Sequence, residues 1–246
     1  MSKLTIVRLY HELLGTYGDQ GNAEVLMHRA RGRNFEVELI EVAPRQPVPT
    51  TGDVYLIGGG EDGPQTAALE MLRVDGGLHQ AVNGGAAVLA VCAGFQLLGT
   101  SLPNQDGVTI DGLGLVDAST VYTDDPRCVG ELFVSPVDDE STSLYTGFEN
   151  HQGRTQIGAG MTPLGWVVSG FGNGLPGEEP SEMVSARIPE GVVNGRVIGT
   201  YMHGPVLARN PELADRILGS VAGTLAPFED DFASEFAAQR RRALPK

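Results

Sequence analysis

Cys92 stands in the setting of the chain that most favours chemistry. A run of small and apolar residues, 86–91, ends at this cysteine, and a helix-forming segment, 93–99, follows at once. Small residues occupy the positions two before and two after it, as the sharp strand-to-helix turn of a nucleophile elbow requires. The dipole at the N-terminus of a helix favours the thiolate form of such a thiol. The alternative interpretation is a small buried side chain at a strand end.

A cysteine nucleophile needs a base, and His203 is the best candidate among the five histidines. It ends a strand predicted over 197–202 and precedes a Gly-Pro pair. In parallel sheets, active-site residues gather at the carboxyl ends of strands, so Cys92 and His203 can lie side by side. His28 and His79 fall in predicted helices and are interpreted as surface residues. The alternative for His203 is a histidine held only by its own loop.

A glycine-rich loop, 58–63, follows another predicted strand, 54–57, and matches the pattern G-x-G-x-x-G. A dinucleotide site is therefore a formal alternative. Against it, the loop does not follow the first strand, Asn83 stands near the place of the ribose-binding acid, and Glu61 and Asp62 would repel a pyrophosphate. We favour a loop whose backbone N–H group approaches a developing oxyanion, with the N–H of Ala93 as second donor.

The elements that must position these residues alternate along the first hundred residues. Strands are predicted near 4–10, 35–40, 54–57 and 86–91, with helices over 23–31, 64–74 and a piece ending near 83. This order predicts right-handed βαβ units and a mostly parallel sheet flanked by helices. A glycine-rich loop, 15–22, precedes the first helix, and Asn22 is predicted to cap that helix.

From about residue 108 the pattern changes to short β-rich stretches. We predict strands over 119–122, 132–137, 166–169 and 183–188, then a helix over 211–221 and a surface helix over 230–242. No change of composition marks a boundary. We therefore expect an α/β fold with additional short β-strands, in a single domain over 1–246 with a helical tail over about 226–246.

Composition narrows the class of protein. The chain has 246 residues and a formal net charge of −14, which argues against nucleic acid or an anionic membrane surface as the main partner. No apolar run is long enough for a membrane span or a signal peptide. Two cysteines form no disulfide framework, so we expect a reducing, cytoplasmic setting. No spacing suggests a metal site, and no P-loop is present, so ATP chemistry would belong to a partner.

Three segments in this order, 58–60, 90–99 and 201–205, resemble the class I glutamine amidotransferases, most closely the branch shared with cobyric acid synthase. The resemblance covers about residues 4–217 and implies a flavodoxin-like fold. Within that branch, segments 13–22 and 147–155 resemble the glutaminase subunits of lipid II isoglutaminyl synthases. This implies hydrolysis of L-glutamine without a cofactor, and delivery of ammonia to an ATP-dependent, Mur-ligase-like synthetase subunit that amidates the D-glutamate of lipid II.

The resemblance also implies roles for the reacting groups. Cys92 would attack the side-chain amide of glutamine and form a thioester. His203 would take the thiol proton and then protonate the leaving ammonia. Backbone N–H groups of the loop Gly59–Gly60 and of Ala93 would hold the oxyanion.

Two further side chains would bind the substrate. Gln96, one turn into the helix after the elbow, would contact the bound glutamine. Arg127 would anchor a substrate carboxylate, since a bidentate guanidinium suits that group. The alternative for Arg127 is an ordinary surface arginine.

The chain departs from the family pattern at one position. Triad amidotransferases usually carry a glutamate two residues after the histidine, and here Pro205 stands there. Another acid must orient His203, either Asp19 of this chain or a residue of the partner. We therefore expect weaker glutaminase activity in the isolated chain than in a complex, with the loop 15–22 near the interface.

Three other functions remain open from the sequence. The chain can serve another acceptor, such as a cobalamin precursor. It can be a cysteine peptidase or chaperone-like protein on a related elbow fold, although Gln96 and the loop 58–60 favour an amidotransferase. It can also be a non-catalytic binding module.

Overall fold

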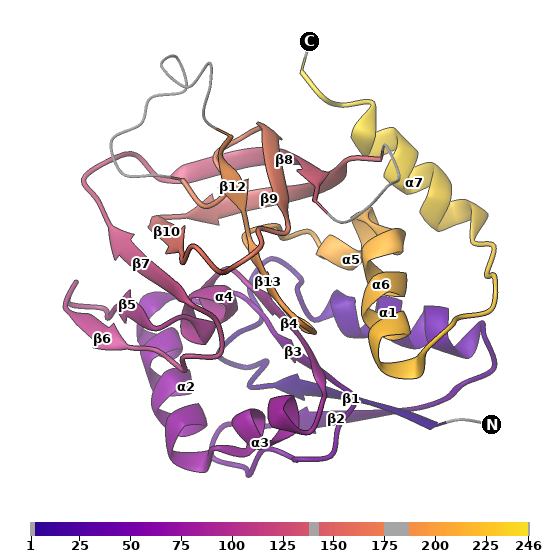
Figure 1. Cartoon of the computed structure of the whole chain (residues 1–246), viewed down its shortest axis with the longest axis horizontal. Helices are drawn as coiled ribbons and strands as arrows, with labels where there is room; N and C mark the ends of the chain where they lie inside the picture. The colour runs from indigo at the N-terminus through magenta and orange to yellow at the C-terminus, as the bar shows by residue number, and fades with distance from the viewer. Residues whose placement is uncertain (1–2, 138–142, 175–186, 246) are drawn as a thin grey trace.

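A computed structural model describes residues 3–137, 143–174 and 187–245. Its central sheet has six strands in the order β13-β14-β4-β3-β1-β2 (Figure 1). These strands are β1 (Lys3–Leu9), β2 (Glu36–Val42), β3 (Val54–Ile57), β4 (Ala87–Val91), β13 (Val192–Asn194) and β14 (Val197–Thr200). All neighbouring pairs are parallel except β13 with β14, so the carboxyl ends of five strands meet at one edge.

The parallel strands follow the flavodoxin-like order, with β14 in the place of the fifth strand. Strands β3 and β4 are buried along their whole length, as expected for strands covered on both faces. The edge strand β2 alternates between exposed and half-buried residues over most of its length. The order in which successive strands join the sheet reverses between β1 and β3, and ligands of such folds bind outside the carboxyl ends of the strands near this point.

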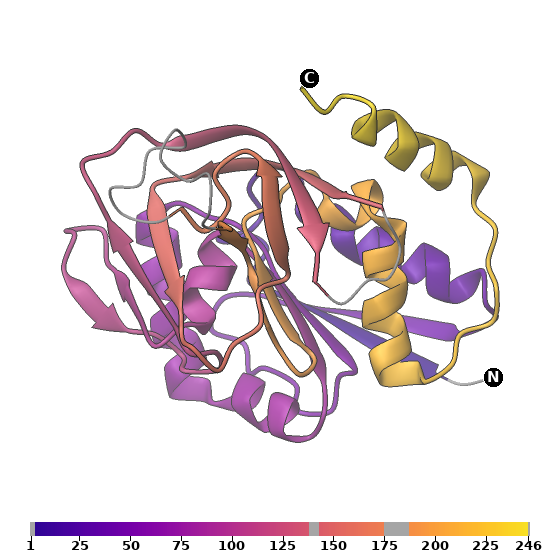
Figure 2. The ribbon, with the colours of Figure 1, turned by 45° about the horizontal axis from the view of Figure 1, so that its top comes forward.

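Helices cover both faces of the sheet (Figures 1 and 2). On one side lie α1 (Gly21–Arg31), α5 (Val206–Arg209) and α6 (Pro211–Ala222), and on the other α2 (Asp62–Asp75), α3 (Gly77–Asn83) and α4 (Ala93–Leu98). The prediction that Asn22 caps the first helix is wrong. Asn22 lies inside α1, and its Oδ1 accepts a hydrogen bond from the backbone N–H of Leu207 (3.0 Å), which ties α1 to α5.

Two smaller sheets stand over the carboxyl edge of the central sheet (Figures 1 and 2). One has the order β10-β7-β5-β6 and the other β12-β11-β8-β9. The first contains β5 (Ser101–Pro103), β6 (Thr109–Asp111), β7 (Ala118–Tyr122) and β10 (Gly153–Ile157); the second contains β8 (Cys128–Pro136), β9 (Tyr145–His151), β11 (Gly165–Ser169) and β12 (Pro189–Glu190). Of the strand predicted over 183–188, residues 183–186 lie outside the described residues, and Arg187 and Ile188 are not in a strand.

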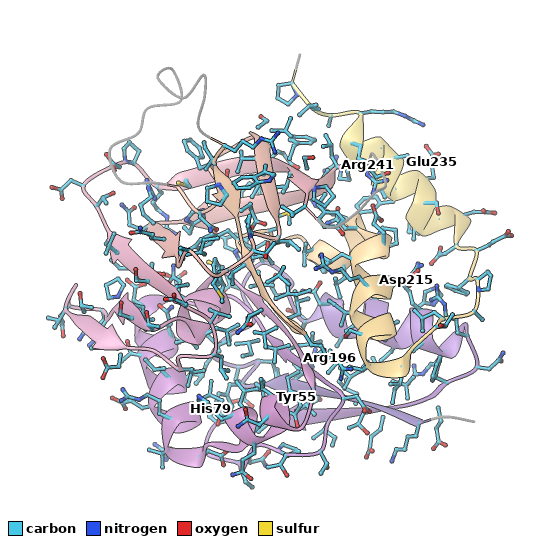
Figure 3. The ribbon with its side chains drawn as sticks, viewed as in Figure 1. Tyr55, His79, Arg196, Asp215, Glu235 and Arg241 are labelled. Atoms are coloured by element: carbon cyan, nitrogen blue, oxygen red, sulfur yellow. The ribbon has the colours of Figure 1, made fainter. Side chains whose placement is uncertain are left out.

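The predicted tail helix is present as α7 (Asp231–Arg241) and runs along the outside of α5 and α6 (Figures 1 and 2). Asp230 caps it by accepting a hydrogen bond from the N–H of Ala233 (3.0 Å). Near its C-terminal end, Arg241 donates to the backbone oxygen of Leu144 (2.8 Å) and pairs with Glu212 on α6 (Figure 3). The tail is thereby attached to both the small antiparallel sheet and α6.

Candidate active site

The turn between β4 and α4 has the geometry of a nucleophile elbow. Cys92 has φ 52° and ψ −107°, a backbone conformation that non-glycine residues rarely adopt. Its N–H donates to the carbonyl of Thr200 on β14 (2.8 Å), which fixes the turn against the neighbouring strand. A Cβ at Gly94 would lie 2.7 Å from the carbonyl oxygen of Ile57, so only glycine fits there. The strained turn leaves 8 % of Cys92 exposed, at the floor of a pocket.

His203 lies beside Cys92 at the end of the adjacent strand, and both residues line this pocket. Its Nδ1 contacts the carboxylate of Asp19, at 3.0 Å from Oδ2 and 3.2 Å from Oδ1. Both side chains are 1 % exposed. The other ring nitrogen, Nε2, is buried and has no hydrogen-bond partner among the described residues. One nitrogen is therefore held by a carboxylate, and the other remains available to a reacting proton.

The charge state of His203 follows from these neighbours. Burial alone would lower the pKa of His203, but the hydrogen bond with Asp19 and the proximity of Cys92 outweigh it and raise the pKa to about 10. The site therefore stabilises the imidazolium that forms when His203 takes a proton.

Asp19 occupies the position that the sequence left open. It comes from the loop between β1 and α1, 184 residues before His203 in the chain. Its Oδ2 also accepts the N–H of Gly59 (2.8 Å), so the loop after β3 fixes the carboxylate. Pro205, at the usual place of the third triad member, lies instead where a Cβ on Gly21 would touch it (2.4 Å to Cγ).

Of the three residues expected to hold the oxyanion, Gly60 and Ala93 line the pocket beside Cys92. Gly59 has a different place. Its N–H is engaged by Asp19, and a Cβ there would lie 2.6 Å from Cε1 of His203. Gly59 thus allows the histidine and its carboxylate to approach the loop, and Gly60 and Ala93 remain the candidates for the oxyanion donors.

Gln96 lies in the pocket wall, but its amide is already engaged. Its Oε1 accepts from Nε2 of Gln65 (2.8 Å), and its Nε2 donates to the hydroxyl of Tyr201 (3.2 Å). Gln65 also donates to the carbonyl of Ala93 (3.2 Å), so these hydrogen-bonded side chains hold the first turn of α4, directly after Cys92, in place. Gln96 therefore shapes the pocket through these bonds.

Arg127 lies at the mouth of the pocket and is exposed. Its Nε donates to Oδ1 of Asn150 (3.0 Å) and its Nη2 to the carbonyl oxygen of the same residue (3.2 Å). On the α2 side of the pocket stand two carboxylates, Glu61 and Asp62, and Tyr122 donates to Oδ1 of Asp62 (2.7 Å). The pocket thus carries one cation and two anions around the thiol.

Sequence reasoning missed a second buried pair beside the pocket. Glu149 and His151 on β9 lie 3.3 Å apart, and both are buried. Glu149 also accepts the N–H groups of Phe171 (2.8 Å) and Gly172 (3.0 Å), and His151 stacks on Tyr201 at 3.7 Å. The sequence distinguishes the segment 147–155 only by its family resemblance, and alternation of polar residues on a strand does not indicate that both faces of the strand are covered.

Neither a candidate metal centre nor a membrane-spanning helix is present in the described ranges. No group of three or more His, Cys, Asp or Glu side chains there could hold a metal ion. None of the helices in those ranges has the length and apolar character needed to cross a membrane.

Comparisons with known proteins agree with this geometry. Residues 5–211 match the model of the CobB/CobQ-like glutamine amidotransferase domain. The chain is 33 % identical over 222 residues to the lipid II isoglutaminyl synthase (glutamine-hydrolyzing) subunit GatD of Staphylococcus aureus, covering 89 % of this chain and 84 % of that one. It is 35 % identical over 218 residues to the subunit of the same name from Streptococcus pneumoniae, covering 88 % and 79 %.

More distant relatives include a cobyric acid synthase of Methylobacterium nodulans, 32 % identical over 176 residues, which cover 68 % of this chain and 32 % of that enzyme. Among solved structures, a glutamine amidotransferase superposes with a TM-score of 0.55 at 17 % identity, over 88 % of this chain and 98 % of its own. Another, from Methylobacillus flagellatus, has a TM-score of 0.51 at 14 % identity, and the match covers 98 % of this chain and 90 % of that one. These two likenesses confirm the predicted flavodoxin-like class I fold. The chain belongs to the CobB/CobQ-like glutamine amidotransferase family.

Proposed function

We propose that this chain is the glutaminase subunit of a lipid II isoglutaminyl synthase. It hydrolyses L-glutamine and passes the ammonia to a Mur-ligase-like, ATP-dependent synthetase subunit, which amidates the D-glutamate of lipid II. The observation that carries the glutaminase step is the convergence of Cys92 and His203, which follow the adjacent strands β4 and β14, with Asp19 from the loop after β1. The similarity to two GatD subunits along most of the chain supports the choice of acceptor.

The reaction uses these groups in two steps. Sγ of Cys92 attacks the side-chain amide carbon of glutamine, while Nε2 of His203 takes the thiol proton. The N–H groups of Gly60 and Ala93 stabilise the oxyanion of the tetrahedral intermediate. The intermediate collapses to a thioester as ammonia leaves with the proton held by His203. In the second step His203 removes a proton from water, which attacks the thioester and releases glutamate and the free thiol.

The charged groups of the pocket fit the two ends of the amino acid. Arg127 offers donors to the α-carboxylate. Asp62, held through one oxygen by Tyr122, offers its other oxygen to the α-ammonium group. No ion pair joins Arg127, Glu61 or Asp62 to another side chain of the described ranges. A zwitterionic substrate would balance the charges of Arg127 and Asp62, which a neutral amide would not.

Asp19 also changes the expectation for the isolated chain. Because the orienting carboxylate belongs to this chain, the alignment of His203 does not require an acid from the partner. A rise of activity in a complex would then come from closure of the site or removal of ammonia. We propose that this chain assembles with such a synthetase subunit in the cytoplasm.

The test is ammonia release from L-glutamine by the wild type, Cys92→Ala and Cys128→Ala, each with and without a co-expressed Mur-ligase-like subunit. Cys128 is fully buried on β8, so its variant controls for loss of a thiol elsewhere. We expect activity in the wild type and Cys128→Ala only. Amidation of purified lipid II by the complex, and not of a cobalamin precursor, identifies the acceptor. Activity that survives Cys92→Ala would exclude the proposed mechanism.

A further inference from the structure

Tyr17 lies over the catalytic histidine. Its ring centroid is 4.9 Å from that of His203 at an angle of 57°, and 5.9 Å from that of Phe148. Tyr17 is 48 % exposed and has φ 56°, a left-handed conformation that bulky residues seldom adopt. It stands two residues before Asp19 on the same loop. Strained, half-exposed aromatic residues that touch a reacting group point to a role in the site.

Strand β9 holds Tyr17 in this place. The backbone N–H and C=O groups of Phe148 both pair with His203 (3.1 and 2.8 Å), so β9 is attached directly to the histidine. Two residues further on, and therefore on the same face of the strand, Asn150 donates through Nδ2 to the hydroxyl of Tyr17. One strand thus supports both the histidine backbone and the ring that covers it.

Asn150 links this arrangement to the proposed carboxylate anchor. Its Oδ1 accepts from Nε of Arg127 (3.0 Å), and its carbonyl oxygen accepts from Nη2 (3.2 Å). The same carbonyl lies 4.0 Å from Sγ of Cys92. These bonds occupy the Nε edge of the guanidinium and leave its terminal edge, Nη1 with Nη2, for a carboxylate.

The pocket is small, and Tyr17, Asn150 and Arg127 line it together with Cys92, so a substrate bound at the thiol contacts these side chains. The cavity measures about 70 Å³, less than half of the roughly 150 Å³ that suffices for benzene in an engineered protein cavity. Glutamine is larger than benzene, so it must fill the site out to Tyr17, Asn150 and Arg127. Arg127 is exposed, so a bound carboxylate would add hydrogen bonds to the two that Arg127 makes with Asn150 and restrict its side chain further.

We propose that Tyr17 is a positioning residue for His203, and that the chain Arg127–Asn150–Tyr17 makes its position depend on whether Arg127 holds a substrate carboxylate. A bound carboxylate fixes the guanidinium, which fixes the Asn150 amide and through it the Tyr17 ring. The base is then aligned best when a complete amino acid occupies the pocket, and hydrolysis of other primary amides is slow. This proposal rests on the glutaminase function proposed above.

The experiment compares L-glutamine with 4-aminobutanamide, which is glutamine without its α-carboxylate. We measure kcat and KM of the full chain, alone and with its synthetase partner, for the wild type and Tyr17→Phe. The variant keeps the ring on His203 and removes the bond to Asn150. The wild type should show a higher kcat for glutamine than for 4-aminobutanamide. Tyr17→Phe should lower kcat for glutamine about 2- to 10-fold, the range of one hydrogen bond, with KM changed less than about 2-fold.

The ratio of the two kcat values separates positioning from a structural role. In Tyr17→Phe the ratio should fall toward one, whereas general damage would lower both kcat values equally and leave the ratio unchanged, which would overturn the proposal. Tyr55→Phe is the matched control, because the hydroxyl of Tyr55 bonds to Pro49 and Gly52 at the opposite end of the sheet (Figure 3). Its ratio should equal that of the wild type.

Two further outcomes are decisive. If the wild type does not turn over 4-aminobutanamide, the ratio has only a lower limit, and an unchanged kcat for glutamine in Tyr17→Phe overturns the proposal. If the wild type releases no ammonia from glutamine in either condition, the glutaminase function itself fails, and the two failures are thereby distinguished.

Discussion

Replacing Asp19 by Asn tests the central contact of the site. The substitution keeps size and shape and removes the negative charge. The N–H of Gly59, which now bonds to Oδ2 at 2.8 Å, would select the oxygen of the new amide. That oxygen would lie 3.0 Å from Nδ1 of His203, but the amide nitrogen, at 3.2 Å, would compete for Nδ1 as a donor and favour the tautomer with its proton on Nε2. Nε2 is the nitrogen that must take the thiol proton, and the imidazolium so formed would lack the carboxylate charge beside it.

The size of the effect follows from these contacts. Losing a hydrogen bond between charged groups costs about 1.5–3 kcal/mol, which at about 1.4 kcal/mol per tenfold change lowers the rate about 10- to 150-fold. The wrong tautomer adds to this, and removal of a triad carboxylate in other enzymes reaches about 10,000-fold. We expect kcat for glutamine to fall about 100- to 10,000-fold, with a smaller change in KM. The pKa of His203 should also fall, because Asp19 contributes to raising it.

The assay is steady-state ammonia release across a range of pH, with thermal unfolding of each variant. Asp53→Asn is the matched control, since Asp53 likewise accepts a backbone N–H, that of Thr5 at 2.7 Å, but lies at the amino end of the sheet. It should retain wild-type kinetics. A folded Asp19→Asn protein with kcat within about 3-fold of the wild type would refute the argument that Asp19 orients the base.

Three other predictions follow from single contacts. Gly59→Ala should abolish measurable glutaminase activity while the protein stays folded, because the new methyl group would lie 2.6 Å from Cε1 of His203; Gly63→Ala, which meets only Gln105 at 3.4 Å, should remain active in the same ammonia assay. Arg127→Ala should raise KM for glutamine about 10-fold or more, as loss of a charged hydrogen bond predicts, and leave KM for 4-aminobutanamide unchanged; equal increases for both amides would contradict the assignment of Arg127 to the carboxylate. Glu190→Gln should stabilise the protein at pH 8 by up to about 3 kcal/mol, measured by urea unfolding. Burial raises the pKa of Glu190 from 4.5 to about 7, so the folded state binds an extra proton between these values and wild-type stability falls as pH rises through them. That slope should disappear in the variant, and its persistence would show that another group causes it.

Glu190 illustrates a property that only the folded chain could reveal. One carboxylate oxygen accepts from Thr200 (2.7 Å) and the N–H of Tyr201 (2.8 Å), and the other is buried without a partner among the described residues. Nothing in the local sequence around a glutamate after a proline indicates that it will be fully buried. Its burial depends on the packing of β12 against β14, and these two strands belong to different sheets.

The sequence by itself determined the parts of this protein that depend on local order. Small residues around Cys92 predicted the elbow, because the strained turn excludes larger side chains nearby. Alternation of strand and helix predicted the parallel sheet, and the sheet placed Cys92 and His203 at one edge. The family followed from three motifs in the right order, and the comparisons confirmed it.

Only the tertiary structure decided how the pocket is completed. It brought Asp19 to His203 from the loop after β1, and it engaged the N–H of Gly59 with that same carboxylate. It also placed Tyr17 over the histidine and joined it through Asn150 to Arg127. These contacts join residues of five separate segments. Their geometry depends on strand order and on loop conformations with positive φ, which local periodicity does not encode, because a crossover connection can place distant segments side by side without leaving a pattern in either one.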